Sequence, residues 1–165
     1  MTVYDHSFNQ NEWFVVLMNL IGFGAIFFLK KRFSFNVSVF LILFGIFVGF
    51  FFDHTISIEP FNYYNVNDNS SFQLIDFFSY TMFGPSSYFF IYIWVRFNIK
   101  FKYFFFYILF WSLMGVSVEW IAHCLGVYHY REGYMIYYSF PFYPISQIIL
   151  FCLYLKINQS LKKTT

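Results

Sequence analysis

The sequence predicts an all-α, polytopic membrane protein: one bundle of five transmembrane helices, with its N terminus outside and its C terminus inside. Composition favours this fold class. Hydrophobic residues make up 59% of the 165 residues and charged residues only 11%, whereas a soluble domain carries roughly 25% charged residues. A membrane-spanning helix needs about 20 apolar residues. Five such helices leave too little chain for a second domain, so we expect a single integral membrane domain.

The distribution of charge along the chain predicts which way the helices run. All but one of the ten basic residues fall in three short patches, and the acidic residues fall in the alternate gaps or just inside the segments facing those gaps. Cytoplasmic loops of membrane proteins are enriched in Lys and Arg, so we expect these patches on the cytoplasmic side. They consist of Lys30, Lys31, Arg32, Arg96, Lys100, Lys102, Lys156, Lys162 and Lys163.

The first two expected spans flank the first basic patch. Residues 13–29 form an apolar segment that ends at this patch, and residues 36–52 form a second segment that ends at Asp53. The second segment contains Gly45 and Gly49, a spacing that lets two helices approach closely. We expect these glycines to serve packing within the chain rather than dimerisation. A homodimer or another membrane protein remains open as a partner.

The third expected span, residues 72–95, follows an asparagine-rich external loop over residues 54–71. This span is interrupted by Gly84 and Pro85. Proline removes a backbone hydrogen bond and clashes with the preceding turn of a helix. We therefore expect a kink near the middle of the membrane.

The last two expected spans are residues 103–125 and residues 134–155, joined by a short outer turn. Pro141 and Pro144 fall in the outer half of the final span, and a short basic tail follows it. Tyrosine and tryptophan gather at the outer boundary of the spans, as the aromatic belt of a membrane protein does.

Charge balance, cysteines and missing motifs argue against several functions. The formal net charge of +2 is too small to indicate nucleic-acid binding. Cys124 and Cys152 are expected near opposite faces of the bilayer, whereas a disulfide needs its Cα atoms within about 7 Å. The chain has no phosphate-binding glycine loop, no Gly-x-Ser-x-Gly and no Cys-x-x-Cys. We predict no cofactor and no nucleic-acid partner; the expected partner is the lipid bilayer.

The fourth expected span carries the most informative polar face. Ser112, Gly115, Glu119 and His123 fall on one side of a helix at about 100° per residue, and bulky residues cover the rest. Glu119 and His123 are four residues apart, so their side chains can meet. Small and ionisable residues gathered on one face indicate that this face is turned towards protein.

Further polar residues are expected at the same depth. Asp76 lies about one turn inside the third span, and Asp53 and His54 lie at the outer end of the second. Arg131 is the single basic residue expected outside, and we predict that it acts as a lid that neutralises the acids. The candidate site is therefore one polar cluster in the outer leaflet, made of Asp53, His54, Asp76, Glu119, His123 and Arg131.

Three interpretations of this cluster are open. The acids are structural and hydrogen-bonded to Tyr, Ser and His, since an unpaired carboxylate in hydrocarbon costs several kcal/mol. Alternatively, they line a small binding or proton-linked site open to the outside. In the third interpretation the cluster binds a metal or performs acid/base catalysis. Glu119 and His123 form a weak pair of candidate metal ligands, because the His-Glu-x-x-His motif is absent.

Several short stretches form a set that points to a family. They are residues 61–68 (Phe-Asn-Tyr-Tyr-Asn-Val-Asn-Asp), Asp76, Gly84 with Pro85, Glu119 with Trp120, and residues 137–141 (Tyr-Tyr-Ser-Phe-Pro). This set resembles a group of small five-helix membrane proteins from Bacillus-like, spore-forming Firmicutes, over most of the chain from Asp53 onward. The group is functionally uncharacterised, so the resemblance implies a bacterial plasma membrane and no particular activity.

The function expected from these patterns is non-enzymatic. We expect a multi-pass protein of the plasma membrane that serves as a small component of a larger assembly or binds a small ligand from outside. The alternative is a membrane-embedded, metal-dependent or acid/base enzyme that uses Glu119, His123 and Asp76.

Overall fold

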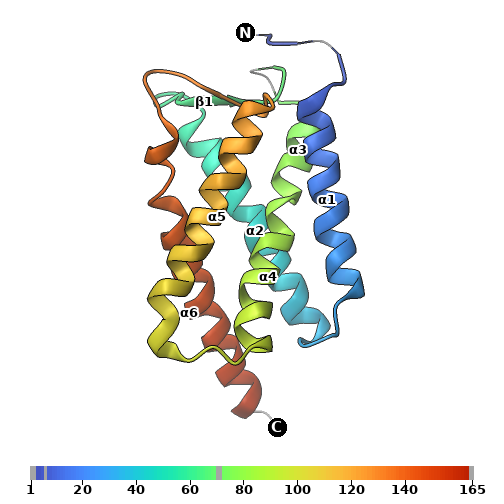
Figure 1. Cartoon of the computed structure of the whole chain (residues 1–165), viewed down its shortest axis with the longest axis vertical. Helices are drawn as coiled ribbons and strands as arrows, with labels where there is room; N and C mark the ends of the chain where they lie inside the picture. The colour runs from blue at the N-terminus through green and yellow to red at the C-terminus, as the bar shows by residue number, and fades with distance from the viewer. Residues whose placement is uncertain (1–2, 6, 70–71, 164–165) are drawn as a thin grey trace.

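The computed structural model describes residues 3–5, 7–69 and 72–163, and these residues form a bundle of helices packed side by side (Figure 1). The α-helices are α1 (Gln10–Phe28), α2 (Phe35–Ile56), α3 (Leu74–Thr81), α4 (Phe83–Arg96), α5 (Phe104–Cys124) and α6 (Phe142–Lys163). Two short 3₁₀ helices precede the last two of them, η1 (Phe101–Tyr103) and η2 (Ile136–Tyr138). The helical fold class is as predicted.

Four helical stretches of the described chain are long and apolar enough to cross a membrane. They are Gln10–Phe28, Phe35–Ile56, Phe101–Cys124 and Ile136–Leu161. Their outward surfaces are strongly apolar, as Phe27 and Phe28 show with exposed fractions of 83% and 87%. Soluble monomers rarely expose apolar patches larger than roughly a few hundred Å². The four stretches therefore agree with the prediction of a multi-pass membrane protein.

The third predicted span consists of two helices. α3 ends at Thr81 and α4 begins at Phe83, which makes Pro85 the third residue of α4. At this position the missing N–H of proline costs no hydrogen bond, because the first amide groups of a helix have no acceptor within that helix. In one continuous helix the amide of residue 85 would have bonded to the carbonyl group of Thr81. The predicted interruption is confirmed, and it ends one helix and starts another.

Glycines bring α2 against α4. A Cβ atom on Gly45 would lie 2.3 Å from the carbonyl oxygen of Phe83, and one on Gly49 would lie 2.6 Å from Cδ2 of the same residue. A larger residue at position 45 would meet main-chain atoms and does not fit unless the helices separate, and one at position 49 would have to displace the Phe83 ring. The prediction that these two glycines serve packing within the chain is confirmed.

A two-stranded antiparallel ribbon covers one end of the bundle (Figure 1). Strands β1 (Tyr64–Val66) and β2 (Tyr128–Tyr130) pair with Asn65 opposite His129. The ribbon joins the α2–α3 connection to the α5–α6 connection, for both of which the sequence predicts a loop or turn. Strands of three residues are too short to show the alternation by which a strand is recognised in a sequence.

The last helix starts later than predicted. α6 begins at Phe142 and continues to Lys163, whereas the expected span was residues 134–155. The prolines explain the shift. Pro141 precedes the helix and Pro144 occupies its first turn, the part of a helix that tolerates proline. The prediction that both prolines lie inside the outer half of a helix is therefore confirmed for Pro144 and wrong for Pro141, which lies in the turn between η2 and α6.

The two halves of the bundle have different interiors. In the half that contains the α1–α2 and α4–α5 connections, called the basic half, a large cluster of buried residues fills the centre, including Leu41, Ile91, Trp111 and Phe151. In the half under the β1–β2 ribbon, called the ribbon half, the buried apolar cluster is small and consists of Val15, Val66, Ala122 and Val127. The interior of the ribbon half is therefore less completely filled by apolar side chains.

Candidate functional site

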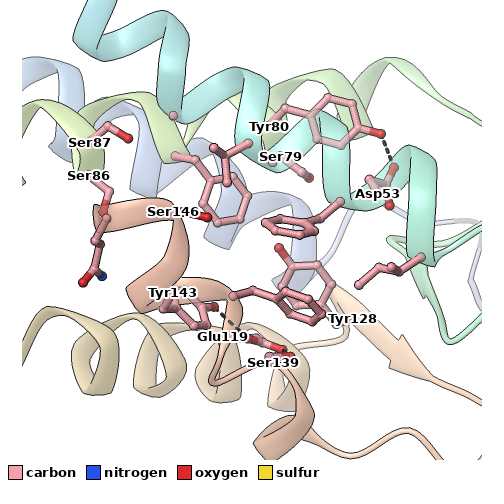
Figure 2. Close-up of a pocket in the computed structure, with 18 of the residues that line it drawn as sticks. Asp53, Ser79, Tyr80, Ser86, Ser87, Glu119, Tyr128, Ser139, Tyr143 and Ser146 are labelled. Carbon is pink, nitrogen blue, oxygen red and sulfur yellow. Dashed lines mark hydrogen bonds between the residues drawn. The ribbon is translucent and has the colours of Figure 1, made fainter. Parts of the chain in front are cut away.

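A cavity of about 160 Å³ lies between α2, α4, α5 and α6 on the side of the ribbon (Figure 2). For comparison, an engineered protein cavity of about 150 Å³ holds a benzene molecule. The floor is apolar, with Phe44, Phe90 and Leu150 among its residues. Serine and tyrosine side chains and two carboxylates, Asp53 and Glu119, also line the cavity.

Glu119 is held by three hydroxyl groups from distant parts of the chain. Tyr130 and Ser139 donate to Oε1 over 2.8 and 2.6 Å, and Tyr143 donates to Oε2 over 2.7 Å. A Cβ atom on Gly115, one turn before Glu119, would lie 2.5 Å from Cε1 of Tyr143. Glycine at this position thus lets the Tyr143 ring cross α5 and reach the carboxylate.

The face of α5 that carries Glu119 is turned towards protein, as predicted, except at His123, which is exposed near the end of the helix. Ser112 and Ala122 are fully buried on this face, and Ser112 donates a hydrogen bond to Gln147 of α6 over 3.2 Å. On the other side of the helix, Leu113 and Trp120 are more than half exposed. The alternation of small and bulky residues is therefore enough to orient α5.

Asp53 lies across the cavity from Glu119 (Figure 2). It accepts hydrogen bonds from the hydroxyl of Tyr80 and from Oγ of Ser57, the latter over 3.0 Å. Its neighbour His54 has Nδ1 3.9 Å from the Asp53 carboxylate and 3.0 Å from the carbonyl oxygen of Phe50. Asp53 and His54 are thus together at the end of α2, as the sequence suggests.

The larger cavity carries no basic side chain. No Lys or Arg is among its lining residues, and His54, whose Nδ1 lies 3.9 Å from the Asp53 carboxylate, does not line it either. The described Arg131 side chain forms no ion pair with Glu119. The main-chain N–H of Arg131 instead donates to the carbonyl oxygen of Tyr63 over 2.8 Å, which ties the end of β2 to the residue before β1.

Asp76 belongs to a different environment. It is buried at the start of α3, where it accepts hydrogen bonds from the main-chain N–H of Gln73 over 2.6 Å and from Nδ2 of Asn67 over 2.7 Å. Together with Asp53 and His54, it lines a second cavity of about 110 Å³. The predicted cluster therefore divides between two cavities, and Asp53 borders both.

His123 makes its contact with the Glu119 site indirectly, through the ring of Tyr130. Its ring stacks on that of Tyr130 with centroids 4.4 Å apart, and its Nδ1 lies 2.7 Å from the carbonyl oxygen of Tyr128. The histidine thus positions the tyrosine that donates to Glu119. Within the described residues, no group of three or more His, Cys, Asp or Glu side chains lies close enough to hold a metal ion.

One interpretation of the sequence expected Tyr and Ser donors for the acids but did not identify them, because the outer tyrosines were assigned to an aromatic belt. Tyr128 and Tyr130 are two residues apart in β2, so their side chains lie on the same face of the strand. Burial, and next the charge of Glu119, raise the pKa of Tyr130 above its ordinary value. The hydroxyl of Tyr130 therefore stays protonated and available as a donor.

No protein-family model, curated protein or solved structure matches the chain.

Proposed function

We propose that the chain is a plasma-membrane protein with five spans, the N terminus outside and the C terminus inside. The third span is then α3 and α4 in series. Residues 74–96 would cover about 34 Å at 1.5 Å per residue, enough for a hydrocarbon core of about 30 Å. The connections that carry Lys30, Arg96 and their basic neighbours lie at the end of the bundle opposite the ribbon (Figure 1), as the positive-inside rule requires.

Cysteine labelling tests this orientation. In a chain with Cys124 and Cys152 replaced by serine, Glu132→Cys lies beside the ribbon and Lys100→Cys lies at the opposite end, and both native side chains are exposed. In intact cells, an impermeant thiol reagent should label the first variant and label the second only after the cells are opened. The reverse pattern would overturn the orientation, and labelling of both in intact cells would mean that α5 does not cross the membrane, which would contradict the five-span proposal.

We further propose that the protein binds a small, compact molecule in the larger cavity and performs no chemistry on it. The observation that carries this proposal is the cavity itself. Its apolar walls with a few convergent polar groups are typical of ligand sites. Its position on the side of the ribbon would place it in the outer half of the membrane, so the ligand would enter from outside.

The geometry favours binding over catalysis by the residues first considered. An enzyme using Glu119, His123 and Asp76 would bring all three to one substrate. Glu119 lines the larger cavity and Asp76 the smaller one, and neither cavity is lined by His123. The donors around Glu119 hold its carboxylate in place, which suits a fixed recognition group.

Filling the cavity tests the binding proposal. Ser146 lines the cavity, whereas Ser117 is exposed on the surface of α5, so Ser146→Leu and Ser117→Leu form a matched pair. The protein in lipid nanodiscs would be screened by saturation-transfer NMR against compact aromatic compounds of positive, zero and negative charge. At least one class should bind to the wild type and to Ser117→Leu and not to Ser146→Leu. A panel in which no compound distinguishes the two variants would contradict the proposal.

A further inference from the structure

We propose that the ligand of the larger cavity is a small organic cation, an ammonium group on a compact aromatic or aliphatic body. This inference depends on the proposed binding function and narrows it to one ligand class. It is drawn from three features of the cavity: two carboxylates without a cationic partner in it, acceptor capacity that the protein leaves unused, and walls rich in aromatic rings.

The first feature is the charge of the walls. Asp53 of α2 and Glu119 of α5 lie on opposite sides of the cavity, and no lining residue is Lys or Arg. The nearest histidine to Asp53 is His54, whose side chain is 39% exposed. Hydroxyl groups stabilise a carboxylate without neutralising it, so the walls hold negative charge and lack a positive group on the cavity side.

The second feature is the number of acceptor positions still open. A carboxylate has about four lone-pair positions. Glu119 receives three hydrogen bonds, from Tyr130, Ser139 and Tyr143. Asp53 receives two, from Tyr80 and Ser57. Each carboxylate therefore keeps at least one position for a further donor, and an ammonium group supplies donors together with the missing charge.

The third feature is the aromatic lining. Tyr64, Tyr128 and Tyr134 line the cavity from the ribbon and the loop after it, and Phe52 and Phe142 line it from α2 and α6, with centroids 4.8 Å apart. Aromatic faces attract cations, and cages of such rings are a common way to bind ammonium groups. They also pack against the apolar body of the ligand.

Other ligand classes fit these features less well. An anion would face two carboxylates with no compensating cation. A bare metal ion would need several ligands around one point, and the described residues offer no such group. A neutral molecule would fill the space but would make no use of the charges on the walls. The volume of about 160 Å³ limits the ligand to about the size of a substituted benzene.

The test uses two probes of nearly the same shape, benzylammonium and ethylbenzene, which differ by the charged ammonium group. Binding to the wild type in nanodiscs would be measured by titration at neutral pH. The signal of the cavity-filled variant Ser146→Leu is subtracted to remove partition into lipid. We expect benzylammonium to bind at least tenfold more tightly than ethylbenzene. Glu119→Gln and Asp53→Asn should each weaken benzylammonium at least tenfold and leave ethylbenzene unchanged.

The outcomes separate the two proposals. Equal binding of both probes, or binding of ethylbenzene alone, would overturn the cation inference and leave the binding function standing. If neither probe gives a signal that Ser146→Leu removes, the binding function fails for ligands of this size, and the inference fails with it. The comparison of probes on the wild type needs no carboxylate variant, so it stays decisive if Glu119→Gln does not fold.

Discussion

The basic half and the ribbon half of the bundle are built from similar residues, but these residues are arranged differently in the two halves. In the basic half, aromatic side chains fill the space between helices. Phe151 lies with its ring 4.9 Å from that of Trp94 and 4.5 Å from that of Phe104. In the ribbon half, tyrosine rings stand around a cavity and direct hydroxyls to two carboxylates. The difference indicates that close packing is concentrated in one half, whereas the other half holds a cavity bordered by hydrogen-bonded carboxylates.

The contrast has a physical basis in what holds membrane helices together. Lipid tails are as apolar as the helix surfaces, so association depends on close packing and on hydrogen bonds between helices. The basic half uses close packing, with Leu41 and Ile91 fully buried. The ribbon half relies on hydrogen bonds that converge on Asp53, Asp76 and Glu119. Changes of volume should therefore matter most in the first half and changes of polarity in the second.

The largest effect is expected at Gly45, which lines the floor of the cavity where the two halves meet. A Cβ atom there would lie 2.3 Å from the main-chain carbonyl oxygen of Phe83, so Gly45→Ala should force α2 away from α4. We expect a loss of about 3 kcal/mol or more, or failure to fold. Gly24 has no atom within 4 Å of its added Cβ, so Gly24→Ala should be neutral or slightly stabilising in a thermal melt. Equal melting temperatures would refute the close contact.

The next largest effect compares two phenylalanines. Phe151 is 2% exposed in the basic half, and Phe151→Ala should lower the free energy of unfolding by about 3–5 kcal/mol. Phe142 is half-buried and borders the cavity, so Phe142→Ala should cost less than half as much. Denaturant titration in one detergent measures both. If Phe142→Ala costs as much as Phe151→Ala, the two halves do not differ in packing as described.

Added volume gives the converse comparison. Ser112 is fully buried, and Ser112→Leu should cost about 1–3 kcal/mol because the core around it has no room. Ser146 borders the cavity, so Ser146→Leu should change the melting temperature little while it abolishes binding. Equal destabilisation by the two leucines would mean that the cavity is not available space.

Much of this fold could be predicted from the sequence, because hydrophobic length and charge bias are local properties. The position of α2 and α5, the break before Pro85 and the packing role of Gly45 and Gly49 all follow from short stretches of residues. The start of α6 could not be predicted in this way. Apolar residues continue from Tyr134, whereas the α-helix begins only after Pro141. Hydrophobicity alone does not show where a helix begins.

The candidate site could be predicted only in part, for a related reason. The spacing on α5 indicates that Glu119 faces protein, but its partners come from β2, the turn after η2, and α6. The contact from Tyr130 depends on the position of β2, which pairs with β1, a segment more than 60 residues earlier in the chain. Asp76 and Glu119 are predicted at a similar depth in the membrane, and no local sequence pattern shows that their hydrogen-bond partners differ.

The two acids can be compared directly. Asp76 is bonded by Asn67 and Gln73, and Glu119 by three hydroxyls, so they share no hydrogen-bond partner. The costs of Asp76→Asn and Glu119→Gln should therefore add within about 0.5 kcal/mol in the double variant. Melting temperatures of the four proteins in one detergent give the comparison. A double variant that costs clearly less than the sum would restore the single shared cluster that the sequence suggested.

The smallest expected effect is a pH dependence in the ribbon. His129 stacks on Tyr4 with ring centroids 3.7 Å apart, and its buried Nε2 has no hydrogen-bond partner among the described residues. Burial lowers the pKa of His129 from its ordinary 6.5, and the carbonyl groups of Gly126 and Asn67 and the charge of Asp68 oppose this shift. The folded protein thus holds this proton less tightly than the unfolded chain.

The sign of the effect follows from proton linkage. As the pH falls through about 6.5, the unfolded chain binds the proton of His129 before the folded protein does, so the contribution to stability is complete above this pH and declines below it. The melting temperature of the wild type should fall between about pH 7.5 and pH 5.5 by more than that of His129→Phe, which keeps a ring against Tyr4 and cannot titrate. Parallel curves for the two proteins would show that His129 does not couple the ribbon to pH, and a steeper fall in His129→Phe would reverse the sign derived from burial.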